Sequence, residues 1–264
     1  MKKTLTALAL AATTVSGSAM AWTEGDFNGS IDMGGSISPE KSGWQWKLGD
    51  SQLDGFNLNA SDATASGNNL VWNGIGTAFP VLMGKTLKPY GNITVGMIPV
   101  ITYGGEGFSI KSSETSAPEV TLTAKGKTDG SKVGTLKFNL NMFALSTPEW
   151  KDANGSTYTY QQIVDPSKSY GNGFLQNAGY YKTMTSTQVK DAIIRILGGD
   201  MITINGAVIE SNYTDAAQFN SAITAEQQGA YASEFVDKSG TLTFPSNNVP
   251  TDWKSSLTVT VSYQ

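Results

Sequence analysis

The stretch that decides the fold lies near the N-terminus and reads Phe27-Asn28-Gly29-Ser30-Ile31-Asp32-Met33-Gly34-Gly35-Ser36-Ile37. Apolar residues and glycines occupy its odd positions, while polar residues and one glycine occupy the even positions. An unbroken alternation with a period of two predicts a β-strand, because successive side chains of a strand point to opposite faces. The large side chains on the apolar face of this predicted strand are Phe27, Ile31, Met33 and Ile37.

Strand-like runs follow along most of the chain, and turn residues separate them. The last run places Leu257, Val259, Val261 and Tyr263 on one face, with hydroxyl residues between them. The other runs are Trp44–Lys47, Leu70–Trp72, Val81–Thr86, Ile98–Tyr103, Phe108–Lys111, Val120–Lys125 and Val133–Met142. Asp129-Gly130 lies between the final two of these and predicts a hairpin. Many short alternating strands predict a mainly β protein with a β-sandwich architecture.

The region from about residue 145 to 235 is expected to interrupt this strand pattern with helices. A first helix is predicted between Thr185 and Gly198, since Thr185 and Gln188 form a capping-box pair and glycine commonly ends a helix. Its apolar residues recur at helical spacing, namely Val189, Ala192, Ile193, Ile196 and Leu197. A second helix is predicted over Thr214–Ala222, and a third from Thr224, where Gln227 repeats the capping box. We therefore expect an α-containing insertion in the sandwich.

The first residues have the character of an export signal. Lys2 and Lys3 supply positive charge, an apolar segment runs from Leu5 to about Ala12, and Ala19-Met20-Ala21 is a small-x-small cleavage site. This pattern predicts a signal peptide over residues 1–21. The remaining chain is then divided into an N-terminal extension, residues 22–38, and a globular domain, residues 39–264, which includes the insertion.

The composition excludes several classes of function. The chain of 264 residues contains no His and no Cys, which removes Ser-His-Asp triads, Cys nucleophiles and the commonest zinc ligands. Carboxylates that could be paired for glycoside hydrolysis, such as Asp50 with Asp54 and Glu114 with Glu119, lie in polar stretches typical of solvated surface. The net charge of −4 argues against nucleic-acid binding. We expect no enzymatic activity, no cofactor, no metal and no nucleic-acid partner.

The N-terminal alternating strand has two possible roles. It could be the first strand of its own domain, or a donor strand that fills an open groove in a neighbouring subunit by strand addition. Burial of its four large apolar side chains at ~1.5–3 kcal/mol each would contribute roughly 6–12 kcal/mol before ordering costs. The C-terminal run is a final strand in either case, and a periplasmic chaperone could pair with its edge while the groove is open.

Several segments of the chain resemble one known family. Trp22 and Gly25–Ile37 match its mature N-terminus, and Trp44–Lys47, Val133–Leu136 and Leu257–Tyr263 match shorter segments. The chain is similar to the FaeG-like family of major fimbrial subunits and adhesins, which build chaperone–usher fimbriae of enteric bacteria. The resemblance implies an incomplete immunoglobulin-like β-sandwich without disulfides that polymerises by donor-strand exchange.

The implied partners are identical or related subunits, a periplasmic chaperone and an outer-membrane usher. The implied location is the fimbrium on the cell surface, reached through the periplasm.

The resemblance also implies adhesion to host glycoconjugates through the insertion. Sugar sites combine exposed aromatic rings with amide or carboxylate side chains, and the insertion has many aromatic rings interleaved with Asn and Gln. The candidate glycan-binding residues are Trp150, Tyr158, Tyr160, Tyr170, Tyr180 and Tyr181. Two alternatives stay open, a non-adhesive or minor pilus subunit and a secreted carbohydrate-binding module that forms no polymer.

Overall fold

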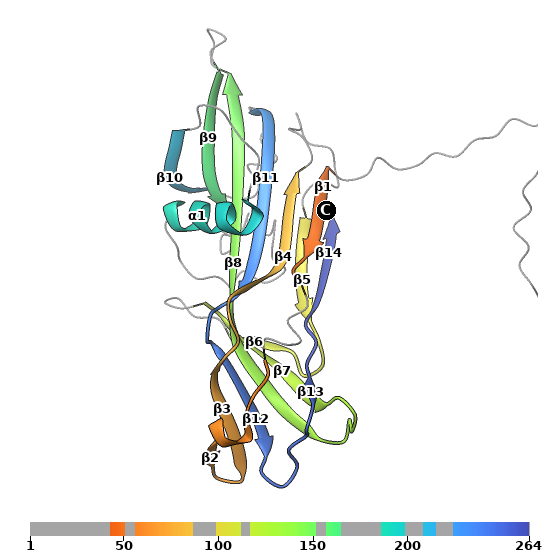
Figure 1. The fold of residues 1–264 in the computed structure, drawn as a ribbon. Coiled ribbons are helices and arrows are strands. Elements are labelled where there is room, and N and C mark those ends of the chain that lie inside the picture. The colour runs from red at the N-terminus through yellow and green to blue at the C-terminus, as the bar shows by residue number, and fades with distance from the viewer. Residues whose placement is uncertain are drawn as a thin grey trace, which may run out of the picture. The chain divides into compact units, whose positions relative to one another are not determined.

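The computed structural model describes residues 43–50, 56–86, 99–111, 117–151, 157–164, 186–198, 208–214 and 224–263. The chain divides into two compact units, Met1–Glu40 and Lys41–Gln264, and all described residues belong to the second. This unit is mainly β, with strands that are antiparallel except where β10 runs parallel to β9 (Figure 1).

The strands before the helix are β1 (Trp44–Leu48), β2 (Thr64–Ser66), β3 (Asn69–Ile75), β4 (Phe79–Thr86), β5 (Pro99–Gly104), β6 (Ser109–Lys111), β7 (Glu119–Gly126), β8 (Val133–Lys151) and β9 (Thr157–Val164). A short 3-10 turn, η1, covers Ala60–Asp62. The helix α1 spans Ser186–Leu197. The strands after it are β10 (Val208–Thr214), β11 (Thr224–Phe235), β12 (Gly240–Pro245), β13 (Trp253–Lys254) and β14 (Thr258–Tyr263).

The long strand β8 connects the two halves of the larger sheet. Its first half pairs with β7 and β12, and its second half pairs with β11 and β9. The main path through this sheet runs β1-β4-β11-β8-β12-β3-β2. Strands β14 and β5 form a separate two-stranded sheet, which we call the ribbon.

The main core is built by alternation within single strands. Along β7, for example, Val120, Leu122 and Ala124 are buried while the residues between them are partly exposed. The inward side chains of β3, β4, β8, β11 and β12 join them in one cluster, which includes Trp72, Leu82, Leu136, Phe138, Leu140, Tyr231, Phe235 and Phe244. This pattern is what a sandwich requires, since each sheet turns one face to the core and the other to solvent.

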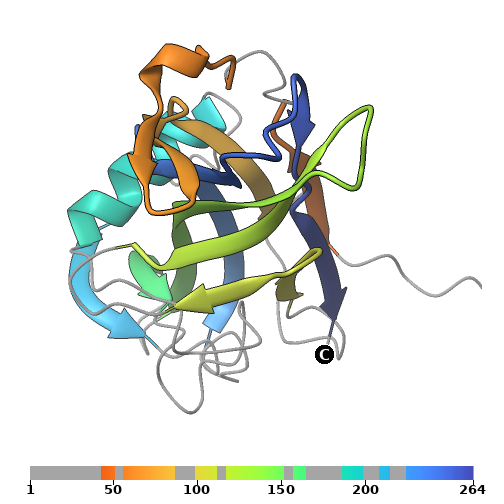
Figure 2. The same cartoon turned by 90° about the horizontal axis from the view of Figure 1, so that it is seen from below.

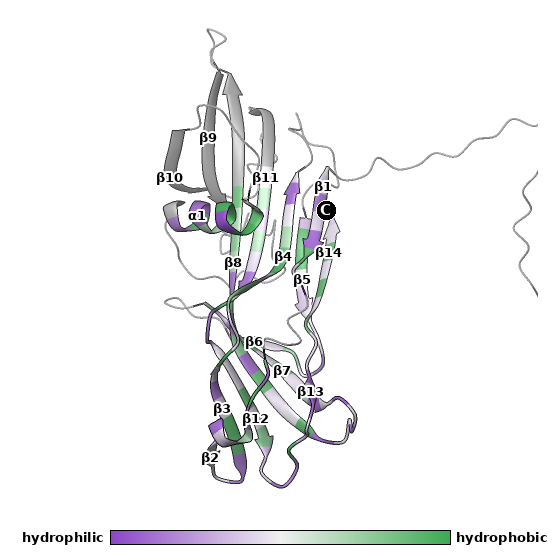
Figure 3. Cartoon of the chain, in the orientation of Figure 1, coloured by the Kyte–Doolittle hydropathy of each residue, from purple (hydrophilic) through white to green (hydrophobic). Residues whose placement is uncertain are grey.

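Helix α1 covers the opposite face of β8 and β11 (Figure 2). Val189, Ala192 and Ile193 of the helix pack against Phe143, Leu145, Ala230 and Ala232, and we call this group the helix-side core. Figure 3 shows hydrophobic residues on α1 beside those of the two strands. The helix ends at Leu197, and Gly198 then adopts φ +61°, a left-handed conformation that glycine reaches without steric cost.

A buried carboxylate fixes the helix to the sheet. Glu234 on β11 is 5% exposed, and its two oxygens accept hydrogen bonds of 2.6 and 2.8 Å from the guanidinium of Arg195 on α1. These hydrogen bonds to Glu234 raise the pKa of Arg195 above its ordinary value. Because both oxygens of Glu234 are bonded, the carboxylate is tolerated beside the helix-side core.

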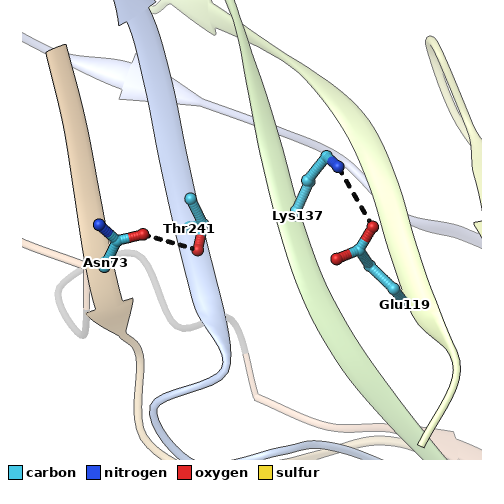
Figure 4. Close-up of polar contacts among 4 residues, drawn as sticks. All are labelled: Asn73, Glu119, Lys137 and Thr241. Atoms are coloured by element: carbon cyan, nitrogen blue, oxygen red, sulfur yellow. Dashed lines mark hydrogen bonds and ion pairs between the residues drawn. The ribbon is translucent and has the colours of Figure 1, made fainter. Parts of the chain in front are cut away.

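The outer face of the sheet built on β3, β12, β8 and β7 carries polar cross-strand contacts (Figure 4). Thr241 Oγ1 donates to Asn73 Oδ1 at 3.2 Å, and Lys137 Nζ lies 3.2 Å from Glu119 Oε1. Both side chains of the ion pair are more than 40% exposed, so the pair contributes little to stability. Glu119, considered above as half of a carboxylate pair, is therefore one partner of an ordinary surface ion pair.

Most of the predicted elements are confirmed. The strands predicted from Trp44, Leu70, Val81, Ile98, Phe108, Val120, Val133 and Leu257 correspond to β1, β3, β4, β5, β6, β7, β8 and β14. The hairpin at Asp129-Gly130 joins β7 to β8, with Lys125 opposite Val133. The first predicted helix is α1.

The third predicted helix is wrong. Thr224 and Gln227 lie in β11, which pairs with β8 over its length and with β4 over its second half. The expectation that the strand pattern is interrupted from about residue 145 to 235 is also wrong over much of that region. β8 continues to Lys151, β9 and β10 lie inside the region, and β11 begins at Thr224. Of the second predicted helix, Thr214 is the last residue of β10 and residues 215–222 lie outside the described residues.

The predicted leader and extension, residues 1–38, also lie outside the described residues, so the division of the chain into leader, extension and domain stays a prediction. Within the part of the chain that is described, no helix has both the length and the apolar character needed to cross a membrane.

Candidate functional site: the open edge of β14

The candidate site is the edge of β14 that faces away from β5. Antiparallel pairing joins β14 to β5 from Thr258 opposite Gly104 to Tyr263 opposite Pro99. Among the described strands, β14 has no second neighbour. An unpaired edge presents a row of backbone N–H and C=O groups that another strand can bond.

The side chains of β14 are only half covered. Its burial alternates strictly, with Val259, Val261 and Tyr263 partly exposed and Thr258, Thr260 and Ser262 exposed. The inward residues contact the main core, but they are only partly buried by it. Soluble proteins protect exposed edges with charge or proline, whereas β14 carries neither. The site is therefore an apolar strand with one free edge.

A second open edge belongs to β1, which lies beside β14 (Figure 1). β1 pairs with β4, and no other described strand pairs with it. Its residue Trp46 donates an indole hydrogen bond of 2.7 Å from Nε1 to the phenol oxygen of Tyr263 on β14. The two free edges are thus linked by side chains, although their backbones are not paired.

A cluster of buried hydroxyl groups connects β5, the other strand of the ribbon, to β11. The Tyr103 hydroxyl donates to Ser233 Oγ at 2.7 Å and lies 2.9 Å from the Tyr231 hydroxyl. Burial raises the pKa of Tyr103 to about 12, and it raises the pKa of Tyr231 well above its ordinary value. Since both phenols keep their protons at neutral pH, they act as hydrogen-bonding groups and not as acids or bases.

The structure describes only some of the site residues that the sequence predicts. Val259, Val261 and Tyr263 lie on β14, and Leu257 directly precedes it and packs partly against the main core. The donor-strand candidates Phe27, Ile31, Met33 and Ile37 lie outside the described residues.

The glycan-binding candidates are also only partly described. Trp150 on β8 is the register partner of Tyr158 on β9, and Tyr160 of β9 is the register partner of Val208. Tyr170, Tyr180 and Tyr181 lie outside the described residues. The backbone pairing brings Trp150 and Tyr158 to one level of the sheet, and it places Tyr160 two residues further along β9.

Sequence reasoning missed the side-chain contacts between the ribbon and the larger sheet, which involve Trp46, Tyr103, Tyr231 and Ser233. Trp46 is separated from Tyr263 by 217 positions in the sequence, and Tyr103 from Ser233 by 130. The sequence does show Trp44 and Trp46 two residues apart in a short strand, which indicates that one face of the strand is apolar. It does not show which residue Trp46 contacts.

Metal chemistry receives no support from the described side chains, among which no group of three or more acidic residues is placed to hold an ion. Among the described strands, the site consists of an unpaired backbone edge above partly exposed apolar side chains.

A mainly β sandwich with an uncovered strand edge is a class of protein suited to association through its sheets. The chain belongs to the family described as fimbrial major and minor subunits, which it matches over residues 1–264.

Individual relatives support this membership. The chain is 39% identical over 154 residues to K88 fimbrial protein AB of Escherichia coli, covering 53% of this chain and 52% of the relative. It is 32% identical over 149 residues to the F41 fimbrial protein of the same species, covering 54% and 53%. These alignments span about half the length of the curated relatives. A longer and weaker match, 24% over 252 residues, joins it to the K88 minor fimbrial subunit FaeI of Escherichia coli and covers 93% of both chains.

Proposed function

We propose that this chain is a structural subunit of a fimbrium and that it polymerises by donor-strand exchange. Its N-terminal extension, residues 22–38, enters the open edge of β14 in the next copy. The observation that carries the proposal is the state of β14, which pairs with only one of the described strands and keeps its inward face partly exposed. Membership of a family of fimbrial subunits supports the same function.

The chemistry of the two partners is complementary. The extension offers Phe27, Ile31, Met33 and Ile37 on one face, and the acceptor offers Val259 and Val261 beside its free backbone groups. An inserted strand would satisfy that edge and cover those apolar groups, which is the energetic basis of β-strand addition. Apolar burial would contribute ~6–12 kcal/mol to the contact between subunits, before the costs of association and ordering are subtracted.

The same edge explains the expected partners during export. Before a neighbouring copy arrives, the exposed edge of β14 is a hazard for aggregation. A periplasmic chaperone that pairs with β14 through Leu257, Val259, Val261 and Tyr263 would protect it, and an outer-membrane usher would exchange the chaperone for the next subunit. The fimbrium then forms on the cell surface.

Assembly is tested by a charge placed on one face of the extension. Ile31→Asp buries an unpaired carboxylate in the groove, which costs several kcal/mol, so we expect no fimbriae on cells that express only this variant. Ser30→Asp is the matched control, because it places the same charge on the outer face of the same strand, and it should leave assembly intact. Fimbriae of normal length from Ile31→Asp, seen by electron microscopy, would overturn the proposal.

We further propose that the subunit binds host glycans through aromatic residues of the predicted insertion. Trp150 and Tyr158 are register partners there, so two candidate rings arise from adjacent strands. Flat aromatic rings suit the C–H faces of sugars, and the candidates are Trp150, Tyr158, Tyr160, Tyr170, Tyr180 and Tyr181.

Single alanine substitutions separate ring stacking on a sugar from ring packing in the protein. At least one of the six variants should assemble fimbriae, melt at the same temperature as the wild type and lose binding to host cells. A ring that packs in the interior lowers the melting temperature instead, by the equivalent of ~3–5 kcal/mol when fully buried. If every variant keeps full binding or unfolds, the glycan site lies elsewhere.

A non-adhesive minor subunit is the second candidate function. It is favoured by the match to the minor fimbrial subunit FaeI, which extends over 93% of both chains. Purified fimbriae that contain this chain and bind no host glycan on an array would support it over the adhesin. A secreted carbohydrate-binding module that forms no polymer would show glycan binding without any polymer by size-exclusion chromatography.

A further inference from the structure

The ribbon of β5 and β14 has to be positioned by side chains. Among the described strands, neither β5 nor β14 pairs through its backbone with the larger sheet. Two tyrosines at opposite ends of the ribbon reach across instead. Tyr103 lies on β5 opposite Val259, and Tyr263 lies on β14 opposite Pro99. Each tyrosine hydroxyl bonds to a residue of the larger sheet.

The tyrosine on β5 is fixed in the interior. Tyr103 donates to Ser233 Oγ, and the same oxygen accepts the backbone N–H of Leu82 at 3.1 Å. Ser233 is fully buried, and it lies where the pairing of β11 with β4 shifts register. The hydrogen bond from Tyr103 to Ser233 therefore anchors this end of the ribbon in the main core.

The tyrosine on β14 bonds to a side chain that has little freedom to move. The ring of Trp46 stacks on Trp44 at 5.2 Å between centroids and 12° between planes. The ring also lies over Gly84, its register partner on β4, where a Cβ atom would overlap the indole. Trp46 therefore presents its N–H from a fixed position, and Tyr263 is tied to β1 at 2.7 Å.

We infer that the Trp46–Tyr263 hydrogen bond is a positioning contact that holds the open edge of β14 in place for an incoming strand. This inference rests on the proposed donor-strand function. A strand paired on one edge separates from its neighbour more readily than a strand paired on both edges. Trp46 and Tyr263 both pack partly against the main core, and their hydrogen bond uses no backbone group of β14. The bond therefore opposes that motion without occupying the backbone groups of the edge, so the acceptor is ordered before the donor arrives.

The experiment measures strand uptake by the full chain. A fluorescent peptide with the sequence of residues 22–38 is added to monomeric protein, and its association and dissociation are followed by fluorescence anisotropy. Tyr263→Phe keeps the ring and removes the acceptor oxygen. We expect the peptide to dissociate about fivefold faster from this variant, which corresponds to one ordinary hydrogen bond.

Thr241→Val is the control. It removes a hydroxyl from β12, outside the ribbon, together with the exposed hydrogen bond of 3.2 Å from Thr241 Oγ1 to Asn73 Oδ1. Peptide dissociation from this variant should equal that from the wild type. Amide hydrogen exchange in β14 should increase in Tyr263→Phe without peptide, while exchange in β11 stays unchanged. A general loss of stability would raise exchange in both strands.

The possible results distinguish the inference from the proposed function. If the wild type takes up no peptide, the donor-strand function is overturned and the inference with it. If the wild type takes up peptide and Tyr263→Phe behaves like Thr241→Val, only the inference is overturned. Trp46→Phe breaks the same hydrogen bond from the other side and should also speed dissociation. If both variants fail to fold, the bond maintains the whole domain and is not a positioning contact.

Discussion

The strands β11 and β14 differ in how many neighbours they have, and the difference separates a stable strand from an available one. β11 has β4 on one edge and β8 on the other. Both of its faces are covered, since Tyr231 and Phe235 lie in the main core while Ala230 and Ala232 contact the helix. Every residue from Gly229 to Phe235 is buried. From Ala230 to Phe235, β11 has no edge and no face left for another chain.

β14 has the opposite character. It has one neighbour among the described strands, and none of its residues is buried. Both strands turn apolar side chains toward the main core, such as Tyr231 and Phe235 on β11 and Val259 and Val261 on β14. The comparison shows that β14 differs from β11 in having an edge without a partner among the described strands.

The largest effect is expected from removing β14 altogether. Deletion of Leu257–Gln264 takes away one strand of the ribbon, uncovers β5 and removes the edge that we expect the chaperone to use. Periplasmic protein should then fall to a small fraction of the wild-type level, even when the chaperone is co-expressed. Immunoblotting of periplasmic extracts measures this, and wild-type accumulation of the truncated chain would contradict it.

The contrast between the two strands predicts different costs for truncated side chains. Phe235 on β11 is 2% exposed and stacks between Phe79 and Phe138 at 5.1 and 5.0 Å. Phe235→Ala should lower the free energy of unfolding by about 3–5 kcal/mol. Val261→Ala, on the partly exposed face of β14, should lower it by about 1 kcal/mol. Urea unfolding of monomeric protein measures both, and equal costs would remove the distinction between the strands.

The packing of α1 on β11 can be weakened by a substitution in the helix, which leaves the sequence of β11 unchanged. Arg195→Met removes the guanidinium and leaves the Glu234 carboxylate buried without those two hydrogen bonds. The free energy of unfolding should fall by about 1.5–3 kcal/mol, the range for hydrogen bonds to a charged group. Arg195→Lys is the control and should recover part of the loss, because it retains the charge but not the paired geometry. A variant as stable as the wild type would show that the helix-side core alone holds α1.

Alkaline pH should loosen the junction between the ribbon and β11. Burial raises the pKa of Tyr103 to about 12 from 10.0, so the folded protein keeps a proton that the unfolded chain releases. The stability that depends on this proton is complete below pH 10 and is lost as the pH rises toward 12, at about 1.4 kcal/mol per pH unit.

Thermal unfolding between pH 9 and 12, with tyrosinate absorbance recorded at 295 nm, measures the alkaline effect. Tyr103→Phe should flatten the dependence on pH, although it also removes a buried hydrogen bond. The prediction fails if the variant and the wild type lose stability in parallel over this range.

The alternation of polar and apolar residues was enough to predict the elements that have one face toward the core and the other toward solvent. β7 and β14 alternate in sequence because one face meets the core and the other meets solvent. The helix α1 is marked by its apolar spacing and by Gly198, since both are consequences of local helical geometry. The mainly β class and most of the strands before residue 145 could be predicted for this reason.

β11 could not be predicted in this way. Its sequence contains Ala230 and Ala232, small residues that fit beneath the helix, and the polar Gln227 and Glu234. With both faces covered, the alternation of polar and apolar residues disappears, and the capping-box pattern at Thr224 then favoured a helix. The strand exists because β4 and β8 supply its hydrogen bonds, which is information that no local window contains.

The sequence by itself determined that the chain is rich in alternating segments, that it lacks His and Cys chemistry, and that apolar and polar residues alternate near both of its ends. Only the tertiary structure decided that β14 pairs with a single described strand. The open edge of β14 depends on which strands become its neighbours, and its position depends on contacts such as Trp46 with Tyr263, 217 residues apart. Periodicity reports the surroundings of a residue along its own strand, whereas pairing and burial are set by distant segments that meet only when the chain folds.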